Sequence, residues 1–387
     1  MNFYKNQTLV IIAAFSLISC NQTKKENSQT ETEPMTEEKA KPETIELLAG
    51  TYTDESSKGI YLLSFNPADG SLENKGLVAE TVSPSYLDIS NDRQFVFAVN
   101  ENDPGTVSSF KWNDDRTQLN LINQQPSEGA HPCFIELNQD ENQLAVANYS
   151  SGNIAIYSVD DNGSIGESPE VRKHEGSGPV TPNQKSAHAH CSKFDANGKF
   201  LYVADLGIDE IISYPLDENG KPGEKQTALA LDKGDGPRHF IFHPSKDLLF
   251  VINELSGSVV SAKVNHDTGL LERIDKKSTL PDDYTGTNSC ADIHITSNGK
   301  FLYASNRGHN SIATFKVAED GTLEKIANEP VQGEWPRNFT LSPDEKHLIV
   351  ANKDTDNITV FRLDPETGLL TYTGNQVMVS KPVCLKF

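Results

Sequence analysis

GPRHFIFHPSKDLLFVINE, residues 236–254, decides the fold of this chain, because a variant of it returns at residues 335–353 as WPRNFTLSPDEKHLIVANK. In both segments apolar and β-branched residues flank a polar turn, which predicts two adjacent strands. The pattern recurs four more times, and its second strands end at Asn100, Asn148, Asp205, Asn253, Asn306 and Asn352. Sixteen residues before each end lies a second fixed position: Pro84, Pro132, Ala189, Pro237, Cys290 and Pro336. A constant spacing inside a loosely spaced repeat indicates a rigid unit that variable loops connect.

Each repeat unit reads as four strands, and residues 289–326 are an example. The runs SCADIHI, FLYASN, SIATFKV and TLEKI follow one another there, with polar turns such as TSNGK and AEDG between them. Four-stranded units at spacings of 46 to 57 residues are typical of a β-propeller, in which each blade packs its sheet on the next.

The two ends of the chain complete one another. Six full units occupy residues 83 to about 380, whereas residues 44–80 supply three strands without a first, and KPVCLKF (381–387) supplies a lone first strand. We therefore expect an all-β, seven-bladed propeller whose ring is closed by the C-terminal strand completing the N-terminal blade, which removes exposed sheet edges.

The N-terminal residues have the features of an export signal. Lys5 precedes the apolar run LVIIAAFSLIS (9–19), which is too short to span a bilayer. The run ends in LISC (17–20), which resembles the lipobox of bacterial lipoproteins, so we expect a signal peptide over 1–19 and lipid attachment at Cys20. The alternative is a plain secreted protein. Residues 20–44 lack large apolar side chains except Met35 and are expected to be a disordered tether before the propeller at 45–387. The predicted location is the cell envelope, lipid-anchored at a periplasmic or outer-membrane face.

The charge balance excludes two classes of partner. With 34 Lys+Arg against 55 Asp+Glu, the formal charge is -21. Such a field repels phosphate backbones and anionic lipid headgroups, so we expect no nucleic acid partner and contact with a membrane only through the lipid. A monomer is expected. The four remaining cysteines, Cys133, Cys191, Cys290 and Cys384, fall in separate repeats and are expected to be buried free thiols.

The variable positions of the repeat predict a functional site. In a propeller the first strand of each blade lines the central channel, so the residues after the two fixed positions meet at one mouth. The first set is Ser85, Cys133, His190, Arg238, Ala291, Arg337 and Val383, and the second is Glu101, Tyr149, Leu206, Glu254, Arg307 and Lys353. Three of only eight arginines fall in these sets, and four histidines lie at or near the same level: His131, His188, His190 and His239.

Arginines that converge with a glutamate suit an anionic or carbonyl-bearing ligand, because a guanidinium pairs bidentately with carboxylate or phosphate. Imidazole and carboxylate at the same place can act as general acid and base. The alternative is structural: Arg238 with Glu254, and Arg337, would form ion pairs that tie blades together. The recurrent asparagines are expected to cap the turn after the second strand. The histidines of HAH (188–190) lack further spaced Cys or His residues, so no metal site is predicted, and no nucleotide or Gly-rich phosphate motif predicts a cofactor.

Several long segments resemble the seven-bladed lactonase family, which includes the propeller-type 6-phosphogluconolactonases and is related to the carboxymuconate lactonizing enzymes. They include GAHPCFIEL, AHAHCSKFDANGKFLYVADLG, GDGPRHFIFHP and WPRNFTLSPDEKHLIVANK. The resemblance spans residues 45–387 and implies the making or breaking of a lactone ring without a metal or organic cofactor. It places catalytic roles on His190, Arg238, Glu254 and Arg307, and we expect His131, His188, His239 and Arg337 to contact substrate. Asn338 departs from the family, where WPRHF is common.

The resemblance implies a lactonase that hydrolyses a sugar lactone, either 6-phosphogluconolactone-like or an unphosphorylated aldonolactone, to the hydroxy acid. Arg238 and Arg307 would bind the anionic group and the developing oxyanion, and either His190 or Glu254 would activate water. Two alternatives remain at this stage. One is a non-catalytic binding propeller for an anionic sugar or peptide, and the other is a lactonizing cycloisomerase acting on an unsaturated dicarboxylate.

Overall fold

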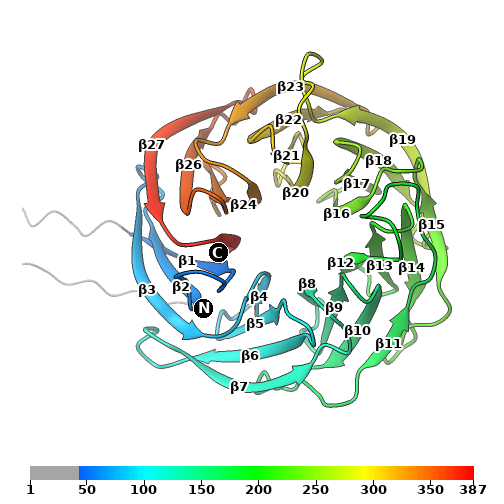
Figure 1. Ribbon diagram of the computed structural model, residues 1–387, viewed down its shortest axis with the longest axis horizontal. Coiled ribbons are helices and arrows are strands. Elements are labelled where there is room, and N and C mark those ends of the chain that lie inside the picture. The colour runs from blue at the N-terminus through cyan, green and yellow to red at the C-terminus, as the bar shows by residue number, and fades with distance from the viewer. Residues whose placement is uncertain (1–42) are drawn as a thin grey trace, which may run out of the picture. The chain divides into compact units, whose positions relative to one another are not determined.

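Seven four-stranded antiparallel sheets surround a central channel in the computed structural model, which describes residues 43–387 (Figure 1). The predicted signal peptide, Cys20 and residues 20–42 of the predicted tether lie outside the described residues. The sheets follow the chain as blades 1 to 6, and blade 7 combines the two ends of the chain. The prediction of a seven-bladed propeller with four-stranded blades is confirmed.

The strands occupy four positions in the blades, from the channel outward. The innermost strands are β28 (Pro382–Lys386), β4 (Leu87–Ile89), β8 (Pro132–Leu137), β12 (Ala189–Phe194), β16 (Pro237–Phe242), β20 (Ser289–Ile295) and β24 (Pro336–Leu341). The second strands are β1 (Ile45–Thr51), β5 (Phe95–Asn100), β9 (Gln143–Asn148), β13 (Phe200–Asp205), β17 (Leu248–Asn253), β21 (Phe301–Arg307) and β25 (His347–Asn352).

The outer half of each blade is built in the same way. The third strands are β2 (Gly59–Phe65), β6 (Thr106–Trp112), β10 (Asn153–Ser158), β14 (Glu210–Pro215), β18 (Ser258–Val264), β22 (Ser311–Val317) and β26 (Asn357–Leu363). The outermost strands are β3 (Leu72–Glu80), β7 (Leu119–Pro126), β11 (Glu170–Lys173), β15 (Gln226–Ala230), β19 (Leu271–Ser278), β23 (Leu323–Pro330) and β27 (Leu370–Met378).

The ring closes through β28, as predicted. This strand pairs antiparallel with β1, with Leu48 opposite Lys386 and Gly50 opposite Cys384. The C-terminal strand is thus the innermost strand of the blade that the N-terminal strands build (Figure 1). Closure leaves β1 with a hydrogen-bonded neighbour on both sides, so the inner edge of β1 is not open to another chain.

Burial explains why the second strands read as continuous apolar runs. Every residue of β13 (FLYVAD) and β25 (HLIVAN) is buried, because both faces of these strands pack against neighbouring sheets. The outermost strands instead consist mostly of partly buried and exposed positions, as in β27. Each fully buried large apolar side chain contributes about 1.5–3 kcal/mol. The core therefore lies between the blades. The thiols of Cys133, Cys191, Cys290 and Cys384 are free and buried, as predicted.

A β-bulge near the start of the inner strand aims side chains into the channel. In β8, β12, β16 and β24 the pairing register shifts so that Cys133, His190, Arg238 and Arg337 are left out of the ladder. Bulges redirect side chains and are frequent beside functional sites. The variable position that follows the first fixed residue of the repeat is thus a bulge.

The recurrent asparagines have a structural role that differs in detail from the predicted turn cap. Nδ2 of Asn148 donates to Ser127 O at 2.8 Å, and Nδ2 of Asn306 donates to Thr279 O at 3.2 Å. These carbonyls belong to the connection from the preceding blade. The asparagines therefore tie consecutive blades together, which a single repeat unit read in isolation does not reveal.

Candidate active site

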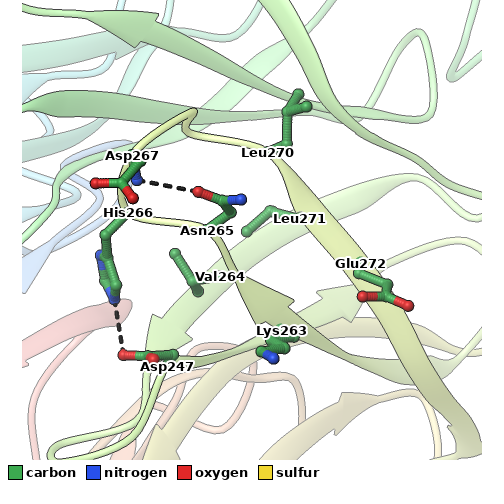
Figure 2. Close-up of a pocket in the computed structure, with 9 residues that line it drawn as sticks. All are labelled: Asp247, Lys263, Val264, Asn265, His266, Asp267, Leu270, Leu271 and Glu272. Carbon is green, nitrogen blue, oxygen red and sulfur yellow. Dashed lines mark hydrogen bonds and ion pairs between the residues drawn. The ribbon is translucent and has the colours of Figure 1, made fainter.

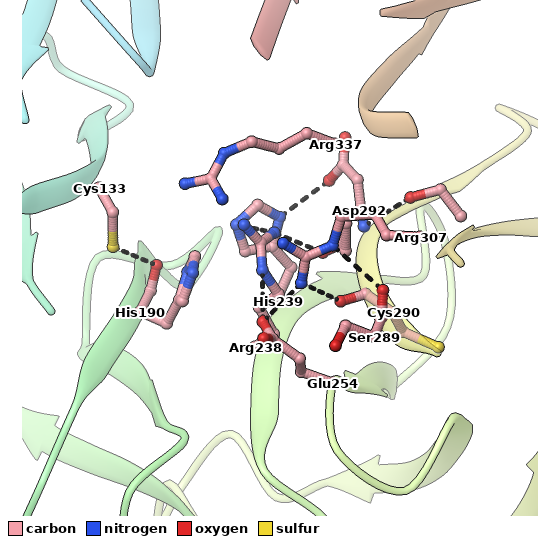
Figure 3. A network of polar contacts seen from close by, with 12 residues as sticks. Cys133, His190, Arg238, His239, Glu254, Ser289, Cys290, Asp292, Arg307 and Arg337 are labelled. Carbon is pink, nitrogen blue, oxygen red and sulfur yellow. Dashed lines mark hydrogen bonds and ion pairs between the residues drawn. The ribbon is translucent and has the colours of Figure 1, made fainter. Parts of the chain in front are cut away.

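The bulged residues of the inner strands meet the ends of the second strands at one mouth of the channel. A pocket there is lined by Ser85, Tyr86, Cys133, Arg238, His239, Arg337, Asn338 and Val383. Figure 3 shows the side chains of Arg238, Glu254 and Arg307 converging, with Arg337 extending across the channel toward the side of Cys133 and His190. The four residues predicted to be catalytic come from blades 3, 4 and 5.

Glu254 holds two arginines at once. Its Oε2 lies 3.0 Å from Nε of Arg238 and 2.9 Å from Nη2 of Arg307. Only 2%, 5% and 13% of the side-chain surfaces of Arg238, Arg307 and Glu254 are exposed. Burial opposes ionisation of Glu254, but the Arg307 and Arg238 guanidiniums outweigh it and hold the pKa of Glu254 below its ordinary value. Glu254 is therefore a carboxylate at neutral pH.

Backbone carbonyls complete the placement of these two guanidiniums. Arg307 donates from Nε to Ser289 O at 3.1 Å and from Nη2 to Cys290 O at 2.9 Å, and Arg238 donates from Nη1 to Ala291 O at 2.6 Å. All three carbonyls belong to β20. Burial and the charges of neighbouring arginines lower the pKa of Arg238 to about 10, which leaves it protonated at neutral pH.

Arg337 is bound more loosely. Its Nη2 lies 3.4 Å from Oε2 of Glu101, and its guanidinium carbon lies 5.3 Å from the ring centroid of Tyr52. The Tyr52 hydroxyl donates to the same Glu101 oxygen at 2.9 Å. With 14% of its side chain exposed and this one ion pair, Arg337 keeps more of its five N–H donors for a ligand than the other two arginines do.

His190 is a neutral imidazole at the same mouth. Its residue surface is 4% exposed, and its buried Nδ1 has no hydrogen-bond partner among residues 43–387. Burial, reinforced by the charge of Arg238, holds the pKa of His190 well below its ordinary value. Its ring centroid lies 5.2 Å from that of His239. An orphaned ring nitrogen in a buried histidine is unusual, because such groups are normally paired.

The other predicted histidines differ in their surroundings. Nδ1 of His188 donates to Tyr149 O at 2.8 Å, and the two rings stack at 4.5 Å, so His188 flanks the mouth on the side of blades 2 and 3. His239 lines the pocket itself. His131 lies in the turn before β8 with a φ of 53°. Like His188, His190, Glu254 and Arg307, it is not among the residues that line the pocket.

Asp292 is a site residue that the repeat pattern missed. It lies one position beyond Ala291, and its Oδ1 accepts a hydrogen bond from Nδ1 of His239 at 2.8 Å. Asn338 donates from Nδ2 to the other oxygen of Asp292 at 2.6 Å. Asn338, which departs from the family pattern, is therefore part of the polar network. The signal for Asp292 was an acidic residue between the apolar residues Ala291 and Ile293 of an inner strand.

Trp335 borders the mouth between two cations. The guanidinium carbon of Arg307 lies 5.2 Å from the indole centroid, and Nζ of Lys353 lies 5.5 Å from it. Cation–π contacts of this kind contribute about 0.5–1 kcal/mol each at exposed sites. The mouth thus carries a local excess of positive charge in a strongly acidic chain.

A second depression lies on the opposite face, in the turns of blade 4 (Figure 2). There Nε2 of His266 lies 3.0 Å from Oδ1 of Asp247, and both side chains are substantially exposed. Within the described residues no group of three or more His, Cys, Asp or Glu side chains could hold a metal ion. Over residues 43–387 no helix has the length and hydropathy required to cross a bilayer.

Comparison with known proteins assigns the class. The family model for the lactonase, 7-bladed beta-propeller, matches residues 46–387. The chain therefore belongs to the seven-bladed β-propeller lactonase family.

Individual relatives cover most of the chain. It is 32% identical over 340 residues to a 6-phosphogluconolactonase of Bacillus subtilis, across 87% of this chain and 97% of that protein. It is 36% identical over 345 residues to a 6-phosphogluconolactonase of Formosa agariphila, across 86% and 97%. The structure of the periplasmic gluconolactonase of Pseudomonas aeruginosa is similar with a TM-score of 0.84 and 32% identity, over 89% of this chain and 99% of that one.

Proposed function

We propose that this protein is a lactonase that hydrolyses a sugar lactone to the hydroxy acid at the arginine-rich mouth of the propeller. The observation that carries the proposal is the pair Arg238 and Arg307 on one carboxylate, beside the unpartnered imidazole of His190. The names of the relatives, 6-phosphogluconolactonase and gluconolactonase, support the same substrate class.

The chemistry required is addition of water to an ester carbonyl. In the transition state the carbonyl oxygen gains negative charge, and buried guanidinium donors stabilise such an oxyanion without reorganisation. We assign this role to Arg238 and Arg307, whose guanidinium groups are held in place by Glu254 and the carbonyls of β20. Their geometry exists before substrate binds, as electrostatic preorganisation demands.

The contacts of the two residues favour His190 over Glu254 as the general base. The carboxylate of Glu254 is committed to two buried ion pairs, and accepting a proton would break both of them. His190 is neutral, and its orphaned Nδ1 has a free lone pair or proton to exchange. In this scheme His190 takes a proton from the attacking water, and the resulting imidazolium returns it to the ring oxygen as the carbon–oxygen bond breaks. Glu254 keeps the two guanidiniums together.

The remaining predicted contacts surround this centre. Arg337, with uncommitted donors, is suited to a phosphate or a carboxylate oxygen of the substrate. His188, which stacks on Tyr149 at the rim, and His239, which lines the pocket, are the proposed contacts to the sugar ring. The contribution of His131 to substrate binding stays a prediction.

The test is a pH-stat assay of the purified full-length chain with gluconolactone and its 6-phosphate. We expect acid release well above the spontaneous rate for at least one of them. Arg238→Ala should abolish most of this rate, whereas Arg362→Ala, which removes an exposed arginine on β26, should not. Lactone loss no faster than the background for both compounds would overturn the proposal in favour of a binding propeller.

We further propose that the protein is a monomer in the cell envelope, anchored by lipid on Cys20. The LISC sequence at residues 17–20 supports the anchor, and the periplasmic location of the Pseudomonas aeruginosa relative supports the compartment. Metabolic labelling with an alkyne fatty acid should mark the wild type and not Cys20→Ala. A label that persists in Cys20→Ala, or a secreted unlabelled wild type, would contradict the anchor.

A further inference from the structure

Asp292 is a buried carboxylate beneath the arginine cluster, with 2% of its surface exposed. Besides His239 and Asn338, its donors are Nε2 of His294 at 3.1 Å and the backbone N–H groups of Ile293 and Phe339 at 3.0 and 3.3 Å. Burial opposes ionisation, but His294 and His239 hold the pKa of Asp292 well below its ordinary value. A buried carboxylate needs this many donors to offset the loss of water.

The surroundings of Asp292 determine the orientation of its partners. Oδ1 of Asn338 accepts from the backbone N–H of Leu385 at 2.7 Å, so Nδ2 of Asn338 must be the atom that faces Asp292. In the same way, Nδ1 of His239 faces an ionised oxygen and must carry a proton. Because burial and the charge of Arg238 lower the pKa of His239 to about 3, the ring is neutral and Nε2 is left as a lone pair.

That lone pair points at Arg238. Nε2 of His239 lies 3.3 Å from Nη1 of Arg238, so the guanidinium donates to it as well as to Ala291 O. Glu254 holds Nε on the other side of the same guanidinium. Within residues 43–387 Nε of Arg238 has its ion pair with Glu254 but no hydrogen bond, and Nη2 has neither, which leaves Nη2 for a ligand in the channel.

From these contacts we infer that Asp292 is a positioning residue, which acts through the tautomer of His239 to orient Arg238 toward the substrate carbonyl. The inference rests on the proposed lactonase function for its kinetic consequence, but the juxtaposition of Asp292, His239 and Arg238 does not depend on it. If Asp292 loses its charge, His239 is free to carry its proton on Nε2. Two N–H groups would then oppose each other, and the Arg238 guanidinium would turn away.

The test combines kinetics with a spectroscopic signature of the tautomer. In Asp292→Asn we expect kcat for the lactone to fall by about 10- to 100-fold with little change in KM, by analogy with the loss seen when the carboxylate that orients a metal-ligating histidine is removed. Long-range ¹H–¹⁵N spectra of histidine-labelled protein should show the Nδ1–H tautomer of His239 in the wild type and its loss in the variant. The double variant Asp292→Asn/His239→Gln should be no slower than His239→Gln alone, because the two residues act in series.

Asp195→Asn is the matched control, because Asp195 is buried at 3% exposure but receives backbone N–H groups of a turn in blade 3. It should destabilise the fold without changing kcat or the His239 spectrum. Wild-type activity together with an Asp292→Asn variant of unchanged kcat and unchanged tautomer would overturn the inference. If the wild type hydrolyses no lactone, the proposed function fails, and the inference about Asp292 is then tested by the spectra alone. In that case a retained Nδ1–H tautomer of His239 in Asp292→Asn overturns the inference.

Discussion

Replacing Glu254 by glutamine removes the single negative charge that two buried arginines share. Glu254 lies 3.0 Å from Arg238 and 2.9 Å from Arg307, and neither arginine has more than 5% of its side chain exposed. Removing one partner of a buried ion pair costs about 3–5 kcal/mol, because the remaining charge is left without compensation. Glutamine keeps one acceptor oxygen, so we expect Glu254→Gln to lower the free energy of unfolding by about 3 kcal/mol, at the lower end of that range.

The assay is urea denaturation monitored by tryptophan fluorescence, with lactone hydrolysis measured on the same samples. The double variant Glu254→Gln/Arg307→Met should recover about half of the lost stability, because it removes one of the two unpaired charges. It should not recover activity, since Arg307 is assigned to the oxyanion. A Glu254→Gln variant that loses less than about 1 kcal/mol, the usual size of an exposed ion pair, would refute the reasoning.

The same variant has a defined pH dependence. The folded pKa of Glu254 lies below its ordinary value, so its carboxylate stabilises the fold at and above the unfolded-state pKa of about 4.3. That stabilisation is lost as the pH falls through the lower folded pKa. The difference in the free energy of unfolding between wild type and Glu254→Gln should therefore have its full size at neutral pH and should decrease only in strong acid. A gap that closed near pH 6, at roughly the ordinary pKa of histidine, would assign the effect to another group.

Three further perturbations test separate parts of the structure. His190→Gln should lower kcat/KM by about 10²- to 10⁴-fold. In the wild type, the acid limb of the pH profile of kcat/KM should lie below the ordinary histidine pKa of about 6.5, because the pKa of His190 in the folded protein is depressed. An acid limb centred near that ordinary value would argue against His190 as the base. Deleting residues 382–387 removes β28 and exposes the inner edge of β1, so size-exclusion chromatography should detect oligomers or aggregates. A stable monomer with an unchanged melting temperature would contradict the role of β28 in closing the ring. Tyr214→Phe leaves Nε2 of buried His174 without its partner at 2.8 Å and should cost about 1–3 kcal/mol of stability at unchanged kcat, as chemical denaturation can measure.

The fold could be predicted almost completely because it repeats. The strands expected in residues 289–326 agree with β20 to β23 within a few residues, and KPVCLKF does form the missing inner strand. A pattern that recurs six times averages out the local ambiguity of any one strand. The constant separation between the fixed positions then placed Arg238 and Glu254 on neighbouring strands at the same end of a blade, as the register of β16 and β17 shows.

The roles within the mouth could not be predicted in the same way. Spacing placed His190, Arg238 and Glu254 at one level, but several contacts that set the roles of the residues there come from the next blade. Arg238 contacts Ala291 O, and His239 contacts Asp292, both 53 residues further along the chain. Asp292 occupies the second position after Cys290, as His239 and Asn338 do after Pro237 and Pro336, and a comparison limited to the first position after the fixed residue passes over it.

The number of blades, the way the ring closes and the residues that face the mouth follow from the order of apolar and turn residues along the chain, since strand alternation and hairpin turns are local properties. Which of those residues is ionised, which imidazole nitrogen carries a proton and which arginine has donors to spare depend on burial and on contacts between distant blades. Those are properties of the closed ring, in which seven inner strands exclude water from a shared channel and bring their charges within a few ångströms of one another.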